Sequence, residues 1–187
     1  VCHERLYKKS KSHIIYPSQL DDIWLTNHKK PLLDKIKFLY VGRLNPEKGI
    51  YDFLKIFDKA ELKAELTIVG DKKSLKISKK NINMLGYISD TQLLINAYDN
   101  CNIMILPSYT EAHPYVVDES LSRKRPVIIF EYIAYVKRNK KGIFISKRDE
   151  FSLAKTTKYI MENYELIQKE IEKNILPTKK IMLKNIS

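Results

Sequence analysis

Two glutamates, Glu111 and Glu119, stand eight positions apart on either side of an expected strand-to-helix turn. The run 102–106 before them is short and apolar, as is typical of a buried parallel strand, and Pro114 fits the first turn of a helix. At ~1.5 Å per residue, such a helix would separate the two carboxylates by roughly the span from a sugar to a ribose across a diphosphate. The pair could therefore hold both ends of a ligand at the edge where open parallel sheets bind them.

Two cations, Arg43 and Lys48, lie in the segment 42–49, which joins an expected strand at 36–41 to a helix. An arginine can form paired hydrogen bonds with phosphate oxygens, and a lysine supplies a compact positive charge. An anion bound at the helix start would also be stabilised by the helix dipole. Phosphate binding is one interpretation of this segment, and an ordinary solvated loop is the other.

The elements that must position these residues alternate between strand and helix. Strands are expected at 36–41, 66–69, 82–85, 102–106, 127–130 and 143–145. Helices are expected at 50–62, after an N-cap at Ser89, at about 114–123, and at 149–174. This alternation predicts an α/β fold, a Rossmann-like parallel sheet with helices on both faces. Because parallel strands end at one edge, the cations and carboxylates should meet there.

Three of the five glycines, Gly42, Gly70 and Gly86, directly follow expected strands. A glycine at such a position lets the backbone approach a ligand closely. Ordinary strand termination explains the same placement, so the glycines alone do not identify a site.

The chain of 187 residues carries a net charge of +12, with 44% hydrophobic residues. This length and composition favour one domain with a substantial core. Much of the positive charge lies in 137–187, where thirteen Lys and Arg residues face six acidic ones. Such a segment suits an anionic phospholipid surface or nucleic acid, although lysines that merely solvate helices would look the same. No signal-type or membrane-spanning apolar run is present in the sequence.

The string from Phe38 to Gly49 resembles the opening of the donor-binding domain in glycosyltransferase family 4, the "group 1" retaining GT-B enzymes. Further motifs follow in the family's order, at 66–70, 85–88, 107–108, 111–119 and 125–128. The resemblance covers roughly residues 36–175. It implies one half of a GT-B fold that binds a nucleotide sugar, UDP- or GDP-linked. The implied reaction transfers a hexose-type sugar to a glycan or lipid-linked acceptor, as in polysaccharide biosynthesis.

The resemblance also implies roles for the residues at the sheet edge. Arg43 and Lys48, next to Gly42, would neutralise the diphosphate of the donor. Glu119 would hold the ribose hydroxyls, and Glu111 would contact the sugar near the transferring carbon as the catalytic residue.

Other donor contacts are implied on the same basis. Backbone amides at Tyr115 and Val116 would meet the phosphates, Tyr87 and Ile88 would flank the base, and His113 would contact the sugar or phosphate. The implied enzyme needs no metal and no cofactor, since cations and a helix N-terminus can stabilise the leaving diphosphate. The sequence contains no Asp-x-Asp triplet, which a metal-dependent sugar transferase would use.

Three departures from the family pattern stand out. Ala112-His113 replaces a glycine-containing pair after the first glutamate, and the segment after Val127-Ile128 lacks the usual Gly-Gly turn. Residues 1–30 are too few for the acceptor domain of a GT-B enzyme. We therefore expect an interdomain linker at 1–30, the nucleotide-sugar domain at 31–175 and a basic segment at 176–187. The missing N-terminal domain would be the partner, and the isolated chain would transfer little sugar.

Three alternative functions remain open from the sequence. One is a non-catalytic GT-B-like binding module, and another is half of a nucleotide-sugar epimerase. The third, a nucleic-acid binder that uses the basic tail, ranks last; it predicts an affinity that falls steeply with salt and does not depend on Glu119. The expected location is the cytoplasm, with the basic tail compatible with a peripheral position on an anionic membrane.

Overall fold

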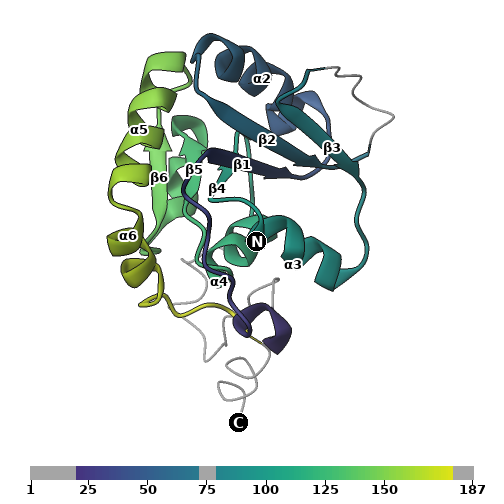
Figure 1. Ribbon diagram of the computed structural model, residues 1–187, viewed down its shortest axis with the longest axis vertical. Coiled ribbons are helices and arrows are strands. Elements are labelled where there is room, and N and C mark those ends of the chain that lie inside the picture. The colour runs from purple at the N-terminus through teal and green to yellow at the C-terminus, as the bar shows by residue number, and fades with distance from the viewer. Residues whose placement is uncertain (1–19, 72–78, 179–187) are drawn as a thin grey trace, which may run out of the picture.

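Six parallel strands form one sheet in the order β3-β2-β1-β4-β5-β6 in a computed structural model that describes residues 20–71 and 79–178 (Figure 1). The strands are β1 (Ile36–Val41), β2 (Ala64–Val69), β3 (Ile82–Gly86), β4 (Ile103–Leu106), β5 (Val127–Phe130) and β6 (Ile143–Ser146). All six expected strands are present within one or two residues of their predicted bounds. The predicted fold class is confirmed, with the strand order of a doubly wound Rossmann sheet.

The direction of strand addition reverses between β1 and β4. β1 pairs with β2 along its whole length, and with β4 through Phe38↔Ile103 and Leu39↔Met104. β4 and β5 are buried at every position, as continuous apolar strands covered on both faces must be. The chain leaves the adjacent carboxyl ends of β1 and β4 toward opposite faces of the sheet, at a topological switch point where sheets of this kind bind ligands.

Helices cover both faces of the sheet. They are α2 (Ile50–Lys59), α3 (Thr91–Asp99), α4 (Tyr115–Ser122), α5 (Glu150–Glu162) and α6 (Tyr164–Ile171). α2 contacts α5 on one side of the sheet, and α3 and α4 lie on the other (Figure 1). Three short 3-10 segments complete the described elements, η1 (Asp22–Leu25), η2 (Pro46–Lys48) and η4 (Glu131–Lys137).

Three helix boundaries differ from expectation. The helix α2 ends at Lys59, three residues before the predicted end at 62. Asp90, not Ser89, caps α3, because its carboxylate accepts a hydrogen bond from Leu93 N at 2.7 Å. The single helix expected at 149–174 is wrong, since the chain leaves helical geometry at Asn163 (φ −115°, ψ 20°) and forms α5 and α6. The Asn163 side chain donates to Tyr159 O, a local bond that competes with the helix ladder.

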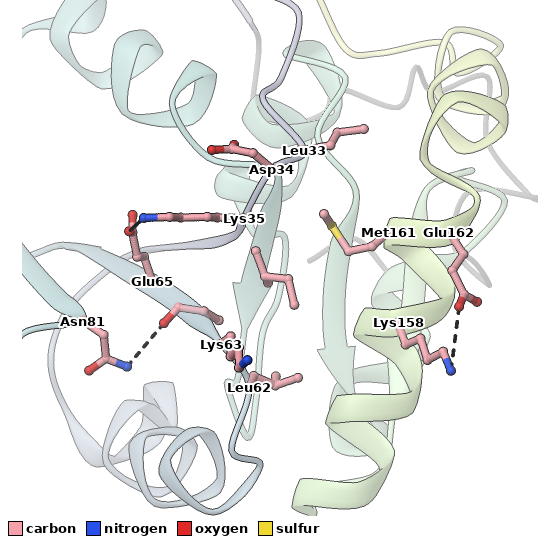
Figure 2. A pocket seen from close by; sticks show the side chains of 12 residues that line it. Leu33, Asp34, Lys35, Leu62, Lys63, Glu65, Asn81, Lys158, Met161 and Glu162 are labelled. Carbon is pink, nitrogen blue, oxygen red and sulfur yellow. Dashed lines mark hydrogen bonds and ion pairs between the residues drawn. The ribbon is translucent and has the colours of Figure 1, made fainter.

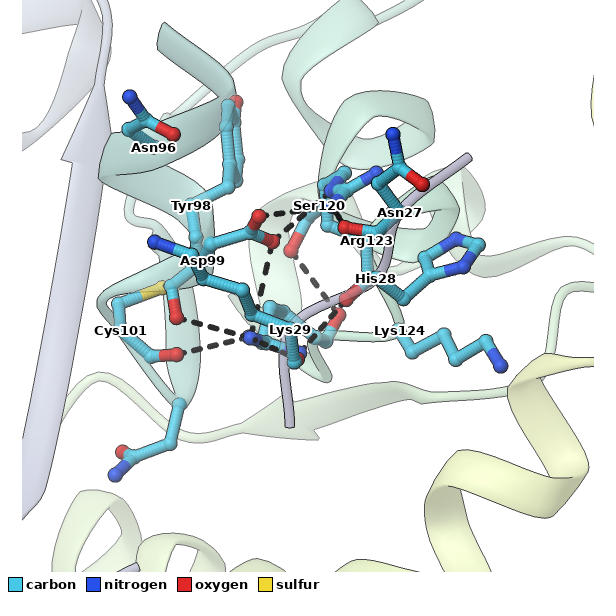
Figure 3. Close-up of polar contacts among 12 residues, drawn as sticks. Asn27, His28, Lys29, Asn96, Tyr98, Asp99, Cys101, Ser120, Arg123 and Lys124 are labelled. Atoms are coloured by element: carbon cyan, nitrogen blue, oxygen red, sulfur yellow. Dashed lines mark hydrogen bonds and ion pairs between the residues drawn. The ribbon is translucent and has the colours of Figure 1, made fainter. Parts of the chain in front are cut away.

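The segment 20–30 is attached to the domain by two buried arginines (Figure 3). Arg123 forms two hydrogen bonds with the Asp99 carboxylate at 2.9 and 2.8 Å, and Arg125 donates to Asp99 O. Arg123 also donates to the carbonyls of Trp24, Thr26 and Asn27, and Arg125 donates to the carbonyl of Lys29. These groups anchor the segment at the amino edge of β4 and β5, and a domain boundary at residue 30 stays a prediction.

Two sequence-based expectations lie mostly outside the described residues. They concern the interdomain linker at 1–30 and the basic segment at 176–187. Among the helices of the described chain, none has both the length and the apolarity to cross a bilayer.

Candidate functional site

The loops after β1 and β4 meet at the switch point because Gly49 allows close backbone contact. Gly49 has φ +65°, and a Cβ built there would lie 2.0 Å from Pro107 O. Only glycine tolerates both constraints. Tyr109 N also donates to Glu47 O at 3.0 Å, which joins the two loops a second time.

Lys48 and Glu111 form an ion pair across this junction. Lys48 Nζ lies 2.6 Å from Glu111 Oε1, and Ser108 Oγ donates to the same oxygen at 2.6 Å. The Lys48 side chain is 22% exposed and that of Glu111 is 8% exposed, so the pair is partly shielded from water. The two residues were expected near each other, but their direct pairing was not anticipated. Glu111 therefore does not cap α4, whose N-cap Pro114 makes no side-chain capping bond.

Tyrosine hydroxyls hold the loop that carries Arg43. Tyr40 donates to Arg43 O at 2.6 Å, and Tyr51 donates to Leu44 O at 3.0 Å. Burial, followed by the nearby Glu111 carboxylate, raises the pKa of Tyr40, which therefore keeps its proton. The Arg43 side chain is exposed and forms no ion pair with any residue that the structure describes. It can therefore reach a ligand at this edge without breaking an existing bond.

Glu119 lies one turn inside α4, as expected, with a largely buried carboxylate. Tyr98, from α3, donates its hydroxyl proton to Glu119 Oε2 at 2.7 Å. Burial raises the pKa of Glu119, the Tyr98 hydrogen bond opposes this, and the neighbouring Asp118 adds to it. The first backbone N–H groups of α4, at Tyr115 and Val116, have no acceptors within the helix. They share the carboxyl edge with Glu111.

His113 contacts the Asp118 carboxylate, which Lys140 also binds. The His113 Nε2 to Asp118 Oδ2 distance is 3.4 Å, and Lys140 Nζ pairs with Asp118 Oδ1. Burial lowers the pKa of His113, Asp118 partly opposes this, and the cations Lys140 and Arg138 lower it further. The imidazole is thus neutral at neutral pH, and Lys140 is the counter-ion of Asp118.

The residues predicted to flank a base lie between β3 and α3. The Tyr87 side chain is 81% exposed, and Ile88 packs partly against the core. Gly42 and Gly70 follow β1 and β2 as expected, and a Cβ on Gly70 would lie 2.5 Å from Gly42 O. Gly86 is the last residue of β3 and does not follow it.

Several residues around Glu111 were missed by sequence reasoning. The Tyr135 hydroxyl donates to Glu111 O at 2.6 Å and accepts from Glu111 N at 3.0 Å. The Arg148 guanidinium lies 4.0 Å from the Tyr109 ring centroid and donates to Pro107 O at 2.6 Å. The absence of a Gly-Gly turn after β5 indicated an unusual loop, but no pattern identified these partners.

A groove of about 760 Å³ lies at the opposite, amino edge of the sheet (Figure 2). It runs between the starts of β1 and β2 and the end of α5, where Lys35 pairs with Glu65 and Lys158 with Glu162. Despite its size, it contains none of the predicted site residues. We assign the candidate site to the carboxyl edge, where charged groups and a helix N-terminus converge. Within the described residues, no three acidic, histidine or cysteine side chains gather as a metal site.

Comparison with known proteins places this geometry in a family. The family model for glycosyl transferases, group 1, matches residues 24–175. The chain is 35% identical over 101 residues to the putative teichuronic acid biosynthesis glycosyltransferase TuaC of Bacillus subtilis (strain 168). This match covers 51% of the present chain and 25% of TuaC.

Solved structures show the same fold. The lipopolysaccharide outer core galactosyltransferase WaaB in its apo form matches with a TM-score of 0.69 at 17% identity, over 98% of this chain and 57% of that chain. Anabaena HepE, solved with UDP and glucose, matches with a TM-score of 0.58 at 15% identity, over 81% of this chain and 44% of that chain. The chain thus spans from a quarter to just over half the length of these proteins.

Proposed function

Because the chain belongs to the group 1 glycosyl transferases, we propose that it is the donor-binding part of a retaining, metal-independent glycosyltransferase. The donor is a nucleotide sugar, UDP-linked in preference to GDP-linked, and the transferred sugar is a hexose. The observation that carries this proposal is the meeting of Lys48, Glu111 and the start of α4 at the switch point. UDP is preferred because HepE, which has the same fold, binds it.

The proposed division of labour follows the charges at this edge. Lys48 and the exposed Arg43 receive the diphosphate, together with the N–H groups of Tyr115 and Val116. Glu119 accepts hydrogen bonds from the ribose hydroxyls, and the base lies against Tyr87 and Ile88. The cations stabilise the negative charge that develops on the leaving diphosphate as the glycosidic bond breaks.

Glu111 has two roles in this proposal. In the free domain it neutralises Lys48. When a donor binds, the diphosphate takes over Lys48, and the Glu111 carboxylate becomes an acceptor for sugar hydroxyls near the transferring carbon. The neutral imidazole of His113, beside the start of α4, contributes a further polar contact to the sugar or phosphate.

The acceptor would be bound by an N-terminal domain of the whole enzyme, and a glycan or lipid-linked acceptor fits the names of the relatives. Exposed cations at Lys137, Arg138 and Lys141 are compatible with a peripheral position at the inner face of a membrane. Sedimentation with anionic vesicles at low salt tests this position, and a chain that stays in the supernatant would contradict it.

The proposal is tested by isothermal titration of the chain with UDP, GDP and ADP. Lys48→Ala should weaken UDP binding roughly 10- to 100-fold, the value of a charge-assisted hydrogen bond. Glu119→Ala should weaken it similarly. The matched control is Lys35→Ala, which removes an ion-paired lysine at the opposite edge and should leave the affinity unchanged.

Selective binding that both site variants weaken would support a working donor site and identify the base. Binding that only Lys35→Ala weakens would move the site to the amino-edge groove. Failure of this chain and of the full-length protein to bind any of the three nucleotides would overturn the proposal.

A further inference from the structure

Tyr98 reaches the candidate ribose-binding carboxylate from a different helix. It lies in the last turn of α3, is completely buried, and donates to Glu119 Oε2 at 2.7 Å. Val116 O lies 3.5 Å from the same hydroxyl. Because a phenol has a single proton, the shorter and charge-assisted bond to Glu119 is the dominant one.

The Tyr98 ring is held independently of any ligand. It packs edge-on against Trp24, with ring centroids 5.6 Å apart and an interplanar angle of 75°. Trp24 is itself fixed, since Arg123 Nη1 donates to Trp24 O at 3.0 Å. The hydroxyl is therefore preorganised before a nucleotide arrives.

We propose that Tyr98 is a positioning residue that binds Oε2 of Glu119 and leaves Oε1 to accept the vicinal hydroxyls of a ribose. This inference rests on the proposed function for its ligand, but not for the Tyr98–Glu119 bond. Its consequence is that the phenol keeps a buried carboxylate ionised and fixed in one rotamer. Without it, burial would favour the protonated acid, which accepts hydroxyl protons more weakly.

The surrounding charges support this role. The groups that act on Glu119 are Tyr98 from α3 and Asp118 on α4 itself, and only Tyr98 lowers the pKa of Glu119. Burial and the Glu119 charge both raise the pKa of Tyr98 far above its ordinary value. In the folded domain at neutral pH, the Tyr98 hydroxyl therefore keeps its proton and remains a hydrogen-bond donor.

The test is the titration of the Glu119 carboxyl carbon, followed by ¹³C NMR and assigned with Glu119→Gln. Tyr98→Phe keeps the ring against Trp24 and removes only the hydroxyl, so the pKa of Glu119 should rise. The matched control is Tyr164→Phe, which removes another buried hydroxyl, one that donates to Asn102 O at 2.6 Å. It should leave the Glu119 titration unchanged. In the unmodified chain, Tyr98 Cζ should shift with the same midpoint as Glu119.

A Glu119 titration that is the same in the unmodified chain and in Tyr98→Phe would overturn the inference. So would a Tyr98 Cζ signal that does not follow Glu119, a result that needs no variant. The functional consequence is measured separately with UDP. Tyr98→Phe should bind UDP roughly tenfold more weakly than the unmodified chain at neutral pH. On acidification, the variant should lose its affinity for UDP at a higher pH than the unmodified chain does.

The two proposals fail in different ways. UDP binding that depends on Lys48 and Glu119 but shows the same affinity and pH profile in Tyr98→Phe would contradict the positioning role and leave the donor site standing. A shifted Glu119 titration, with no nucleotide binding by this chain or by the full-length protein, would confirm the Tyr98–Glu119 coupling and contradict the proposed function.

Discussion

Lys48 Nζ lies 2.6 Å from Glu111 Oε1, so an ion pair joins the loop after β1 to the loop after β4 across the switch point of the sheet. In the proposed function, Lys48 receives the diphosphate of the donor and Glu111 accepts hydrogen bonds from its sugar. An anionic ligand must therefore compete with Glu111 for Lys48. Without a ligand, the charges of Lys48 and Glu111 neutralise each other.

This competition predicts the effect of Glu111→Gln on nucleotide binding. Removing the negative charge frees Lys48 for the diphosphate and removes a repulsion, so UDP should bind as tightly as in the unmodified chain or several-fold more tightly. Binding of a UDP-hexose should lose any advantage over UDP, because the sugar loses its acceptor. Titration calorimetry with both ligands measures this difference.

The control for this change is Glu65→Gln, which breaks the exposed Lys35–Glu65 pair at the other edge and should leave both affinities unaltered. If Glu111→Gln instead weakened UDP as strongly as Lys48→Ala, Glu111 would serve to position Lys48 and the competition would be refuted.

Tyr135→Phe should loosen the backbone at Glu111. The Tyr135 hydroxyl accepts from Glu111 N and donates to Glu111 O, so its loss leaves that amide without its partner. Hydrogen exchange at the Glu111 amide should accelerate, while the amide of Ile105 in β4 stays protected. Tyr132→Phe is the matched control, because its ring contacts Tyr109 and no described residue bonds its hydroxyl. Equal exchange rates of the Glu111 amide in the two variants would show that the Tyr135 hydroxyl does not hold the Glu111 backbone.

Asp99→Asn should destabilise the domain strongly. Asp99 is the carboxylate shared by Arg123 and Arg125, whose side chains are 1% and 0% exposed. Losing one partner leaves buried positive charge uncompensated, which costs about 3–5 kcal/mol. Urea unfolding measures the loss, and the exposed pair in Glu65→Gln should change stability by less than about 1 kcal/mol. A comparably small loss in Asp99→Asn would contradict a structural role for the cluster.

Glu119→Gln should stabilise the fold near neutral pH. Burial raises the pKa of Glu119 in the folded chain, so the folded state holds this proton more tightly than the unfolded state. The stabilisation from this bound proton is therefore fully present below the pKa of Glu119 in the unfolded chain. It is lost as the pH rises through the pKa of Glu119 in the folded chain. The stability gained by Glu119→Gln should be largest at neutral pH and shrink on acidification.

Urea unfolding across the acid-to-neutral range measures this dependence. Glu170→Gln is the control. Because Lys173 lowers the pKa of Glu170, Glu170→Gln should reduce stability at neutral pH, and this loss should shrink on acidification. A gain in stability in Glu119→Gln that grows on acidification would contradict a raised pKa of Glu119 in the folded chain.

The sheet could be predicted from the sequence because short, mainly apolar strands alternate with helical patterns, and β4 and β5 are apolar and buried throughout. The convergence of Lys48 and Glu111 was also predictable, since parallel strands share a carboxyl edge. The helix break at Asn163 was not, because the apolar stripe continues through it and the break depends on local hydrogen bonds.

The partners of the site residues were beyond prediction for a different reason. Tyr98 and Tyr135 reach Glu119 and Glu111 from positions 21 and 24 residues away in the chain. A tyrosine in an apolar stripe is compatible with simple core packing, and nothing in its spacing shows where its hydroxyl points. Such contacts depend on the register and packing of whole elements.

The most direct test of the donor-site assignment is a structure of the chain bound to UDP. We predict the diphosphate at Lys48 and the start of α4, with the ribose on Glu119 and the Lys48–Glu111 pair broken. UDP in the amino-edge groove between Lys35 and Met161, with Lys48 still paired to Glu111, would contradict the account.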